Sequence, residues 1–118
     1  MSKLTILALA AATSISSTTT STGVDVSDFT GNGKLMLDAA ALTGTTPTLD
    51  VKIQHSDTLG GTYTDTGVAF TQVAGVASNQ QQDVSLDQFK KFVRVVSTLG
   101  GTTPVSVRGV YLIGNKAL

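Results

Sequence analysis

The stretch Leu49-Asp-Val-Lys-Ile-Gln54 alternates strictly between apolar and polar side chains. Successive side chains of a β-strand point to opposite faces, so Leu49, Val51 and Ile53 share one face. This pattern is typical of a strand with one buried and one solvated face. The segment therefore predicts a half-buried strand, and its neighbours can be interpreted from it in both directions.

Further short strands are expected on both sides of this segment. Turn residues such as Gly31-Asn-Gly33 and Asp57 to Gly61 separate runs rich in β-branched and aromatic side chains. The expected strands cover residues 24–26, 34–41, 63–73, 80–84, 92–99 and 105–113. Many short strands with turns between them predict an all-β chain, an antiparallel β-sandwich or a barrel-like domain.

An internal repeat flanks the opening stretch. Leu42-Thr-Gly-Thr-Thr-Pro47 returns further along the chain as Leu99-Gly-Gly-Thr-Thr-Pro104. Each copy follows an apolar segment and precedes an alternating one, with Val105 and Val107 after the second copy. Glycine supplies unusual backbone angles, and proline favours the start of a strand. We expect two β-hairpins that pack as equivalent halves of the domain.

One short helix is expected between the strands. Ser85-Leu-Asp-Gln88 fits a capping box, with Ser85 at the N-cap and Gln88 three residues later. We expect one or two turns that place Leu86 and Phe89 over an open end of the sheets.

The first 23 residues differ in composition from the rest. Lys3 and the apolar-rich run 4–12 resemble a short signal peptide, although a retained N-terminal arm is the interpretation we favour. The Thr/Ser-rich tract 13–23 buries almost nothing apolar and is not expected to be ordered alone. We expect an extended arm over 1–23 and a β-sandwich domain over 24–118. The arm either crosses a partner, which we favour, or forms an edge strand of the same domain.

The composition of the chain excludes several functions. Its 118 residues contain eight Lys and Arg against eight Asp, with no Glu, Cys or Trp and one His. Balanced charge excludes a basic face for nucleic acid, and the absence of Cys excludes a disulfide scaffold and a thiolate zinc site. Ser and Thr supply 30 residues. This composition favours strands and turns over catalysis.

Three groups of reactive residues are better explained by structure than by chemistry. His55-Ser-Asp57 has the residue types of a catalytic triad, but neighbours in a strand point to opposite faces. Asp25 and Asp28 lack the spacing of a calcium loop, and turn chemistry explains them. Lys90, Lys91 and Arg94 are expected to form a solvated surface beside Asp83 and Asp87. We therefore expect no enzyme activity, no metal and no cofactor, and only Tyr63 and Tyr111 could stack on a sugar.

Four stretches together resemble small β-rich structural proteins of tailed bacteriophages and prophages. They are Leu49 to Asp57, Gly61 to Asp65, Phe89 to Val96 and Gly100 to Pro104. The resemblance covers residues 24–114, and such proteins include head-decoration, or cement, proteins. It implies a virion protein on the outer surface of the capsid that binds the major capsid protein and copies of itself. It implies no catalytic residue, and neither nucleic acid nor membrane as a partner.

The N-terminal arm lies outside the resemblance, and we expect it to add to capsid binding. Strand addition would place its apolar side chains in grooves of the capsid or of a neighbouring copy: Leu4, Ile6, Leu7, Leu9 and Ile15. Deleting residues 2–22 should then leave a folded domain that no longer holds the capsid. The alternatives are a secreted or surface β-sandwich module, adhesive or sugar-binding, with residues 1–12 as its signal peptide, and a phage tail or neck component.

Overall fold

Strands make up most of the structure, a computed structural model that describes residues 2–117. In chain order the elements are β1 (Ser2–Ile15), β2 (Thr19–Thr20), β3 (Val24–Asp25), β4 (Phe29–Ala39), β5 (Thr43–Ser56), β6 (Thr64–Ala69), β7 (Ser78–Ser85), the 3-10 helix η1 (Leu86–Gln88) and β8 (Phe92–Ala117). All strand pairs are antiparallel. The expected all-β class is confirmed.

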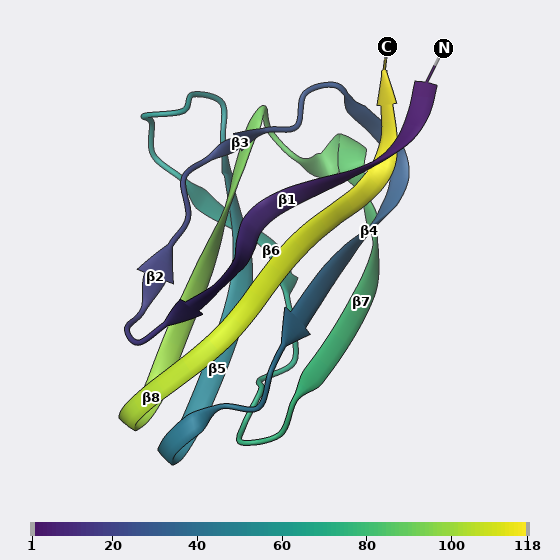
Figure 1. The fold of residues 1–118 in the computed structure, drawn as a ribbon. Coiled ribbons are helices and arrows are strands. Elements are labelled where there is room, and N and C mark those ends of the chain that lie inside the picture. The colour runs from purple at the N-terminus through teal and green to yellow at the C-terminus, as the bar shows by residue number, and fades with distance from the viewer. Residues whose placement is uncertain (1, 118) are drawn as a thin grey trace.

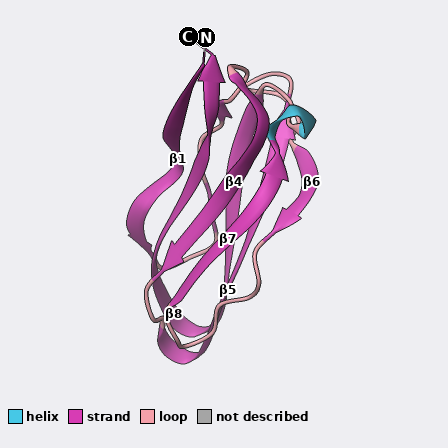
Figure 2. Ribbon diagram, turned by 90° about the vertical axis from the view of Figure 1, so that its right-hand side faces the viewer, coloured by secondary structure: helices cyan, strands magenta, loops and turns pink. Residues whose placement is uncertain are grey.

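The long strand β8 organises the sheet. The hydrogen-bonded path runs β6-β5-β8-β4-β7, and β1, β2 and β3 also pair with β8. The first part of β8 and its bend, up to Val105, pair with β5, whereas the part from Ser106 onward pairs with β1 and β4. Because one strand serves both groups, a single antiparallel sheet curls into a half-barrel (Figure 1; Figure 2). A separate two-sheet sandwich is not confirmed.

The two copies of the repeat form matching corners at the end of the molecule opposite the termini (Figure 1). Gly44 and Gly101 have φ angles of 117° and 100°, and Thr46 and Thr103 have 46° and 47°. The corners also pair with each other, for example Thr43 with Val105. The equivalence of the two copies is therefore confirmed.

The expected hairpin form of the repeat is wrong. Within residues 2–117, β4 pairs with β7 and β8, while β5 pairs with β6 and β8. The strands on either side of a corner thus belong to different groups of the curled sheet, and each corner carries the chain from one group to the other.

The core fills the inside of the curl. The buried side chains form one cluster that includes Leu35 and Leu37 of β4, Leu49 and Ile53 of β5, and Val93, Val95, Val110 and Leu112 of β8. In β5 the buried apolar residues are Leu49, Val51 and Ile53, the face predicted from the alternation.

A 3-10 turn replaces the expected helix at the end of the curl. η1 has three residues, and Ser85 forms no side-chain cap hydrogen bond, so the capping box is wrong. Leu86 is buried, as expected for a residue closing the end, and Phe89 is half-buried. The Leu86 side chain packs against Gly33, where an added Cβ would lie 2.9 Å from Leu86 Cδ1. The helix is limited to a single turn, since the next strand, β8, already begins at Phe92.

The extended N-terminal arm is not evident. Residues 2–15 form β1, which pairs with β8 from Ser2 opposite Ala117 to Ile15 opposite Ser106. The following polar tract lies along the first part of β8, where Ser21 N donates to Val95 O at 2.9 Å. The edge strand in the same domain, the alternative to an arm on a partner, is therefore what the structure contains. The tract has few apolar side chains to bury, and its backbone is held in place by hydrogen bonds to β8.

Candidate functional site

The alternation of β8 is inverted beyond the second corner. Ser106 and Arg108 are buried, whereas Val105 and Val107 are 37% and 47% exposed. The corner repeat makes Ser106 equivalent to Leu49, a core residue of β5. The corner therefore sets which face of this strand turns inward. Polar side chains here lie inside and apolar ones outside.

The inverted strand produces an exposed apolar surface over β1, β8 and β4. Ile6 lies opposite Ile113 and Ala8 opposite Tyr111 on the β1 side, and Met36 lies opposite Tyr111 on the β4 side. Opposite residues of antiparallel strands project from the same face. We call this surface the outer apolar face, and it consists of Leu4, Ile6, Ala8, Met36, Val105, Val107, Tyr111 and Ile113.

Tyr111 lies flat on this face because of a glycine. A Cβ added to Gly109 would come within 2.9 Å of the Tyr111 Cζ atom, so the ring covers the bare backbone of its own strand. Packing an aromatic ring over a strand glycine replaces the missing side chain. The Tyr111 side chain is half-buried, because one face of its ring lies against Gly109.

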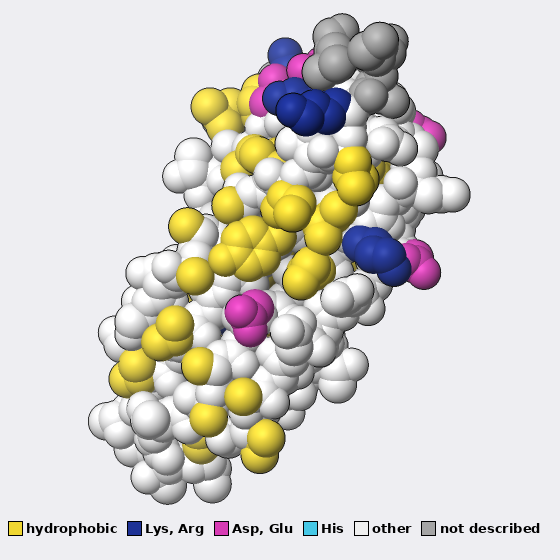
Figure 3. All heavy atoms as spheres, turned by 45° about the vertical axis from the view of Figure 1, so that its right-hand side comes forward, with side chains coloured by type: hydrophobic (Ala, Val, Ile, Leu, Met, Phe, Trp, Pro, Cys, Tyr) yellow, Lys and Arg dark blue, Asp and Glu magenta, His cyan; other side chains and the backbone are white. Residues whose placement is uncertain are grey.

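Charged side chains lie beside and within the outer apolar face (Figure 3). Lys34 Nζ and Asp83 Oδ1 form an ion pair of 2.9 Å on the β4–β7 side. Lys3 and Lys116 are exposed at the end near the termini. Asp38 is exposed within the face, opposite Gly109 and between Met36 and Val107. An apolar surface with charged side chains around it is a common form of protein contact surface.

The five apolar residues expected to bind a neighbour are divided by the structure. Leu4 and Ile6 are each 68% exposed, whereas Leu9 and Ile15 are 3% and 7% exposed and belong to the chain's own core. Leu7 packs against that core. Only Leu4 and Ile6 therefore remain available to another molecule.

Arg108 is a buried cation that the sequence analysis did not single out. It is 2% exposed, its Nε donates to Ser97 Oγ at 2.9 Å, and its Nη1 donates to Ala11 O at 3.4 Å. Burial lowers its pKa, and no carboxylate of residues 2–117 forms an ion pair with it. The Ala11 contact lies where β1 shifts register, so Arg108 ties the irregular part of β1 to the inside of the sheet.

The His55-Ser56-Asp57 group is divided among separate contacts. His55 Nδ1 accepts from Lys90 N at 3.2 Å, and its ring meets Phe89 edge-on. Ser56 Oγ donates to Thr58 O at 2.8 Å. These contacts hold the turn after β5 together, and His55 is half-buried near the end of that strand.

The cationic cluster lies beside one of the two acids expected there. Lys90 and Lys91 line the same depression as Asp87, whereas Asp83 pairs with Lys34. Lys90 Nζ also lies 3.9 Å from Asp57 Oδ2. Arg94 stacks on the Tyr63 ring at 4.2 Å. That contact also covers one face of Tyr63, and the Tyr63 hydroxyl donates to Leu59 O.

Turn chemistry is confirmed at the Asp25 turn. Asp25 Oδ1 accepts from both Ser27 Oγ at 2.7 Å and Ser27 N at 2.9 Å. These hydrogen bonds, the side-chain one first, hold the Asp25 pKa below its ordinary value. Among residues 2–117, no group of three or more His, Cys, Asp or Glu side chains is arranged to hold a metal ion.

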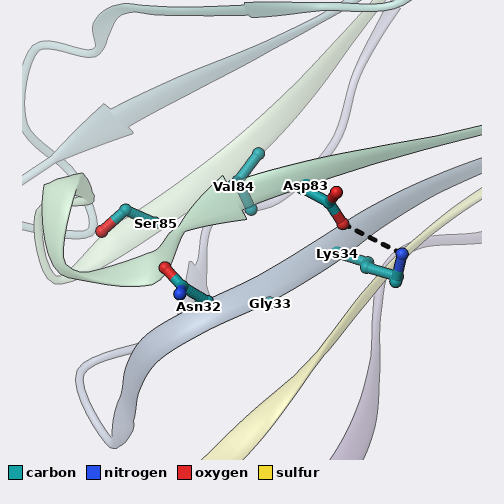
Figure 4. A pocket seen from close by; sticks show the side chains of 6 residues that line it. All are labelled: Asn32, Gly33, Lys34, Asp83, Val84 and Ser85. Atoms are coloured by element: carbon teal, nitrogen blue, oxygen red, sulfur yellow. Dashed lines mark hydrogen bonds and ion pairs between the residues drawn. The ribbon is translucent and has the colours of Figure 1, made fainter.

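A shallow depression of about 470 Å³ lies where β4 and β7 pair (Figure 4). Its lining residues are Asn32, Gly33, Lys34, Asp83, Val84 and Ser85. The only charged residues that line it, Lys34 and Asp83, form an ion pair with each other.

In the described part of the chain no helix is long and apolar enough to cross a membrane.

Acidification is expected to destabilise the fold through its single histidine. Burial, and next the charge of Lys90, hold the His55 pKa below its ordinary value of 6.5, while Asp57 opposes this shift. The unfolded chain therefore binds the proton first, so stability present above pH 6.5 is lost as the pH falls. The lowered pKa values of Asp25 and Asp65 act in the same direction, but only below 3.8.

The measurement is urea unfolding between pH 7 and about pH 5, where histidine is the side chain that ordinarily titrates. The midpoint should fall with pH in the wild type and stay level in His55→Gln. Equal slopes in the two proteins would show that His55 is not the titrating group.

Comparison with known proteins supports the fold and gives no family. No family model matches the chain, and no curated protein matches it in sequence. A chain of the infectious bursal disease virus VP2 subviral particle is similar with a TM-score of 0.57 and 11% identity, covering 98% of this chain and 32% of that one. The SPBc2 prophage-derived protein YomS is similar with a TM-score of 0.54 and 15% identity, covering 95% of each chain.

These likenesses show a shared antiparallel β fold. This chain spans about a third of the infectious bursal disease virus chain and nearly the whole of YomS. The β-rich character implied by the sequence resemblance is thereby confirmed.

Proposed function

We propose that this chain is a structural protein of a bacteriophage virion, a decoration or cement protein that binds the outer surface of the major capsid protein and stabilises the head. The outer apolar face carries the proposal. It is an exposed apolar surface on a sheet whose other side is a packed core. The likeness in fold to a prophage-derived protein and to a virus particle protein supports the same class.

Docking of this face has a plain energetic basis. Full burial of a Leu or Ile side chain contributes about 1.5–3 kcal/mol, and Leu4 and Ile6 are each 68% exposed before contact. Part of that gain offsets the loss of freedom on association. Because many copies would bind one shell, a modest contact per copy is enough to hold neighbouring capsid subunits together.

The proposed work is mechanical and requires no reactive group. The partners are the major capsid protein and other copies of this chain, with no cofactor, nucleic acid or membrane. The chain is proposed not to be an enzyme. The engaged side chains of His55 and Ser56 support this, since both are used in turn contacts.

The test is to locate the chain on particles of the phage that encodes it. Purified particles are analysed by mass spectrometry and electron cryomicroscopy. Density for the chain on the head with icosahedral symmetry would support the proposal. Density confined to the tail or neck would replace it with the tail-component alternative, and absence from the particles would overturn both.

Polar substitutions on the outer apolar face are expected to weaken capsid binding. The double variant Leu4→Ser, Ile6→Ser should bind stripped capsids about 30–150-fold more weakly, since each of the two lost contacts contributes on the order of 1–1.5 kcal/mol. The measurement is co-sedimentation over a concentration series. Val76→Ser is the matched control, because Val76 is 78% exposed in the loop after β6. Equal binding by the double variant and the control would exclude this face.

The secreted sugar-binding alternative finds less support. Removal of residues 1–12 as a signal peptide would take Leu9 and Ala10 out of the core. Arg94 covers one face of Tyr63, so Tyr111 is the better of the two expected stacking platforms. An intact mass of the mature protein that lacks these residues would favour this alternative.

A further inference from the structure

The β1 strand has a free edge. Within residues 2–117 it pairs with β8 on one side and with no strand on the other. A free strand edge presents unpaired N–H and C=O groups that can accept a further strand. From Ser2 to Ala8 the pairing with β8 is regular, and register shifts begin only after Ala8. This regular part is the section of β1 suited to strand addition.

Another edge of the sheet is protected, unlike this one. On β7, the Gln80 side chain exchanges two hydrogen bonds of 2.8 Å with the backbone of Thr71, and Gln82 Nε2 donates to Ala69 O. These side chains bridge β7 to the last residue of β6 and to the loop that follows it. On β6, Asp65 pairs with Lys52, and the strand is only six residues long. Side-chain bridges, charges and short length are the ordinary means of blocking an edge.

The free edge of β1 has less protection, because Lys3 is its one charged residue. Between Lys3 and Asp25 the sequence has no charged residue and no proline. Leu4 and Ile6 are each 68% exposed beside it. Beyond Lys3 the strand is uncharged, so a second copy of the same strand meets little electrostatic repulsion there. The chain as a whole has a net charge of zero, which does not oppose self-association.

We propose that two copies of this chain pair through the free edges of their β1 strands. The strands run antiparallel about a two-fold axis that passes between the two Thr5 residues. Thr5 is the centre of the regular stretch from Ser2 to Ala8. Leu4 of each copy then lies opposite Ile6 of the other, and both project from the outer face. The two Lys3 residues lie opposite Leu7 and away from each other.

The pairing has a consequence for the surface of the dimer. A two-fold axis between antiparallel strands of one sheet is perpendicular to that sheet. The outer apolar faces of both copies therefore point the same way and join across the axis. This inference rests on β1 alone and stands apart from capsid binding, although a doubled face would suit a protein that bridges capsid subunits.

The test uses the absence of cysteine from the chain. In the Thr5→Cys variant of the full chain, the proposed pairing brings two Cα atoms to about 4.5–5.5 Å, within the range of a disulfide. Mild oxidation should give a covalent dimer. Thr64→Cys, an exposed position on β6, is the matched control. We expect about tenfold or more dimer from Thr5→Cys, because pairing raises the local thiol concentration.

Equal yields of dimer from the two variants would overturn the proposal. Sedimentation velocity of the wild-type protein gives a second measurement, in which a dimer that grows with concentration supports it and a monomer throughout contradicts it. The β1 pairing and the proposed capsid binding can fail independently. A wild-type monomer that co-sediments with capsids would overturn only the pairing, and a dimer that fails to bind capsids would overturn only the proposed function.

Discussion

Gly101→Ala is expected to destabilise the fold by about 2–5 kcal/mol, because the corner it occupies accepts no side chain. Its φ of +100° is unfavourable for any residue with a Cβ. A Cβ there would also lie 2.6 Å from Thr46 O and 2.7 Å from Thr45 O. Both oxygens belong to the backbone of the other corner, so relief of the overlap requires the two corners to separate. The measurement is the free energy of unfolding in urea.

Matched glycines separate the two causes. Gly44→Ala should cost as much as Gly101→Ala, since its Cβ would lie 2.7 Å from Thr103 O at a φ of +117°. Gly67 has a φ of +89° with nothing within 4 Å, so Gly67→Ala carries only the backbone cost of about 1–2 kcal/mol. Gly75→Ala, with open space and no positive φ, should be nearly neutral. Equal losses in Gly101→Ala and Gly67→Ala would show that the corners do not constrain each other.

At the two corners, the repeat could be predicted from the sequence, but the pairing of the strands beside it could not. The repeated Gly-Thr-Thr-Pro motif is visible in the sequence, and its two copies have matching backbone angles. A strand, a turn and a second strand are compatible with a hairpin or with a corner between two groups of strands. The choice depends on β8, which pairs with both β4 and β5 from far along the chain. Local sequence carries no information about that distant partner.

The outer apolar face could not be predicted from the sequence either, because it also depends on how β8 is placed in the sheet. Alternation over residues 105–113 predicts a strand, and the strand is present in β8. Alternation alone does not say which face is buried, although apolar side chains such as Val105 and Val107 usually are. The corner geometry turns Ser106 and Arg108 inward instead. The outer apolar face exists because of that inversion, so it could be found only once the direction of the strand was known.

Deleting β1, residues 2–15, is expected to abolish cooperative folding. The deletion removes Leu9, Ala10 and Ile15 from the core and the Ala11 carbonyl from Arg108. Each large apolar side chain lost from a core costs about 1.5–3 kcal/mol, and domains of this size are stable by only about 5–15 kcal/mol in total. Loss of the whole strand also leaves the backbone groups of β8 unpaired along its C-terminal part. The expected product has no sharp thermal transition by circular dichroism.

The same experiment decides between an edge strand and a dispensable arm. An arm that only reached a partner could be removed with its domain intact, so the truncated chain would still unfold in one sharp transition. That outcome would contradict the place of β1 in the core. The full-length double variant Leu4→Ser, Ile6→Ser is the control, because both side chains are exposed and its thermal midpoint should stay within about 3 °C of the wild type. A folded control beside an unfolded truncation would show that one strand serves two purposes. Leu9 and Ile15 hold the fold from inside, while Leu4 and Ile6 face whatever the protein binds.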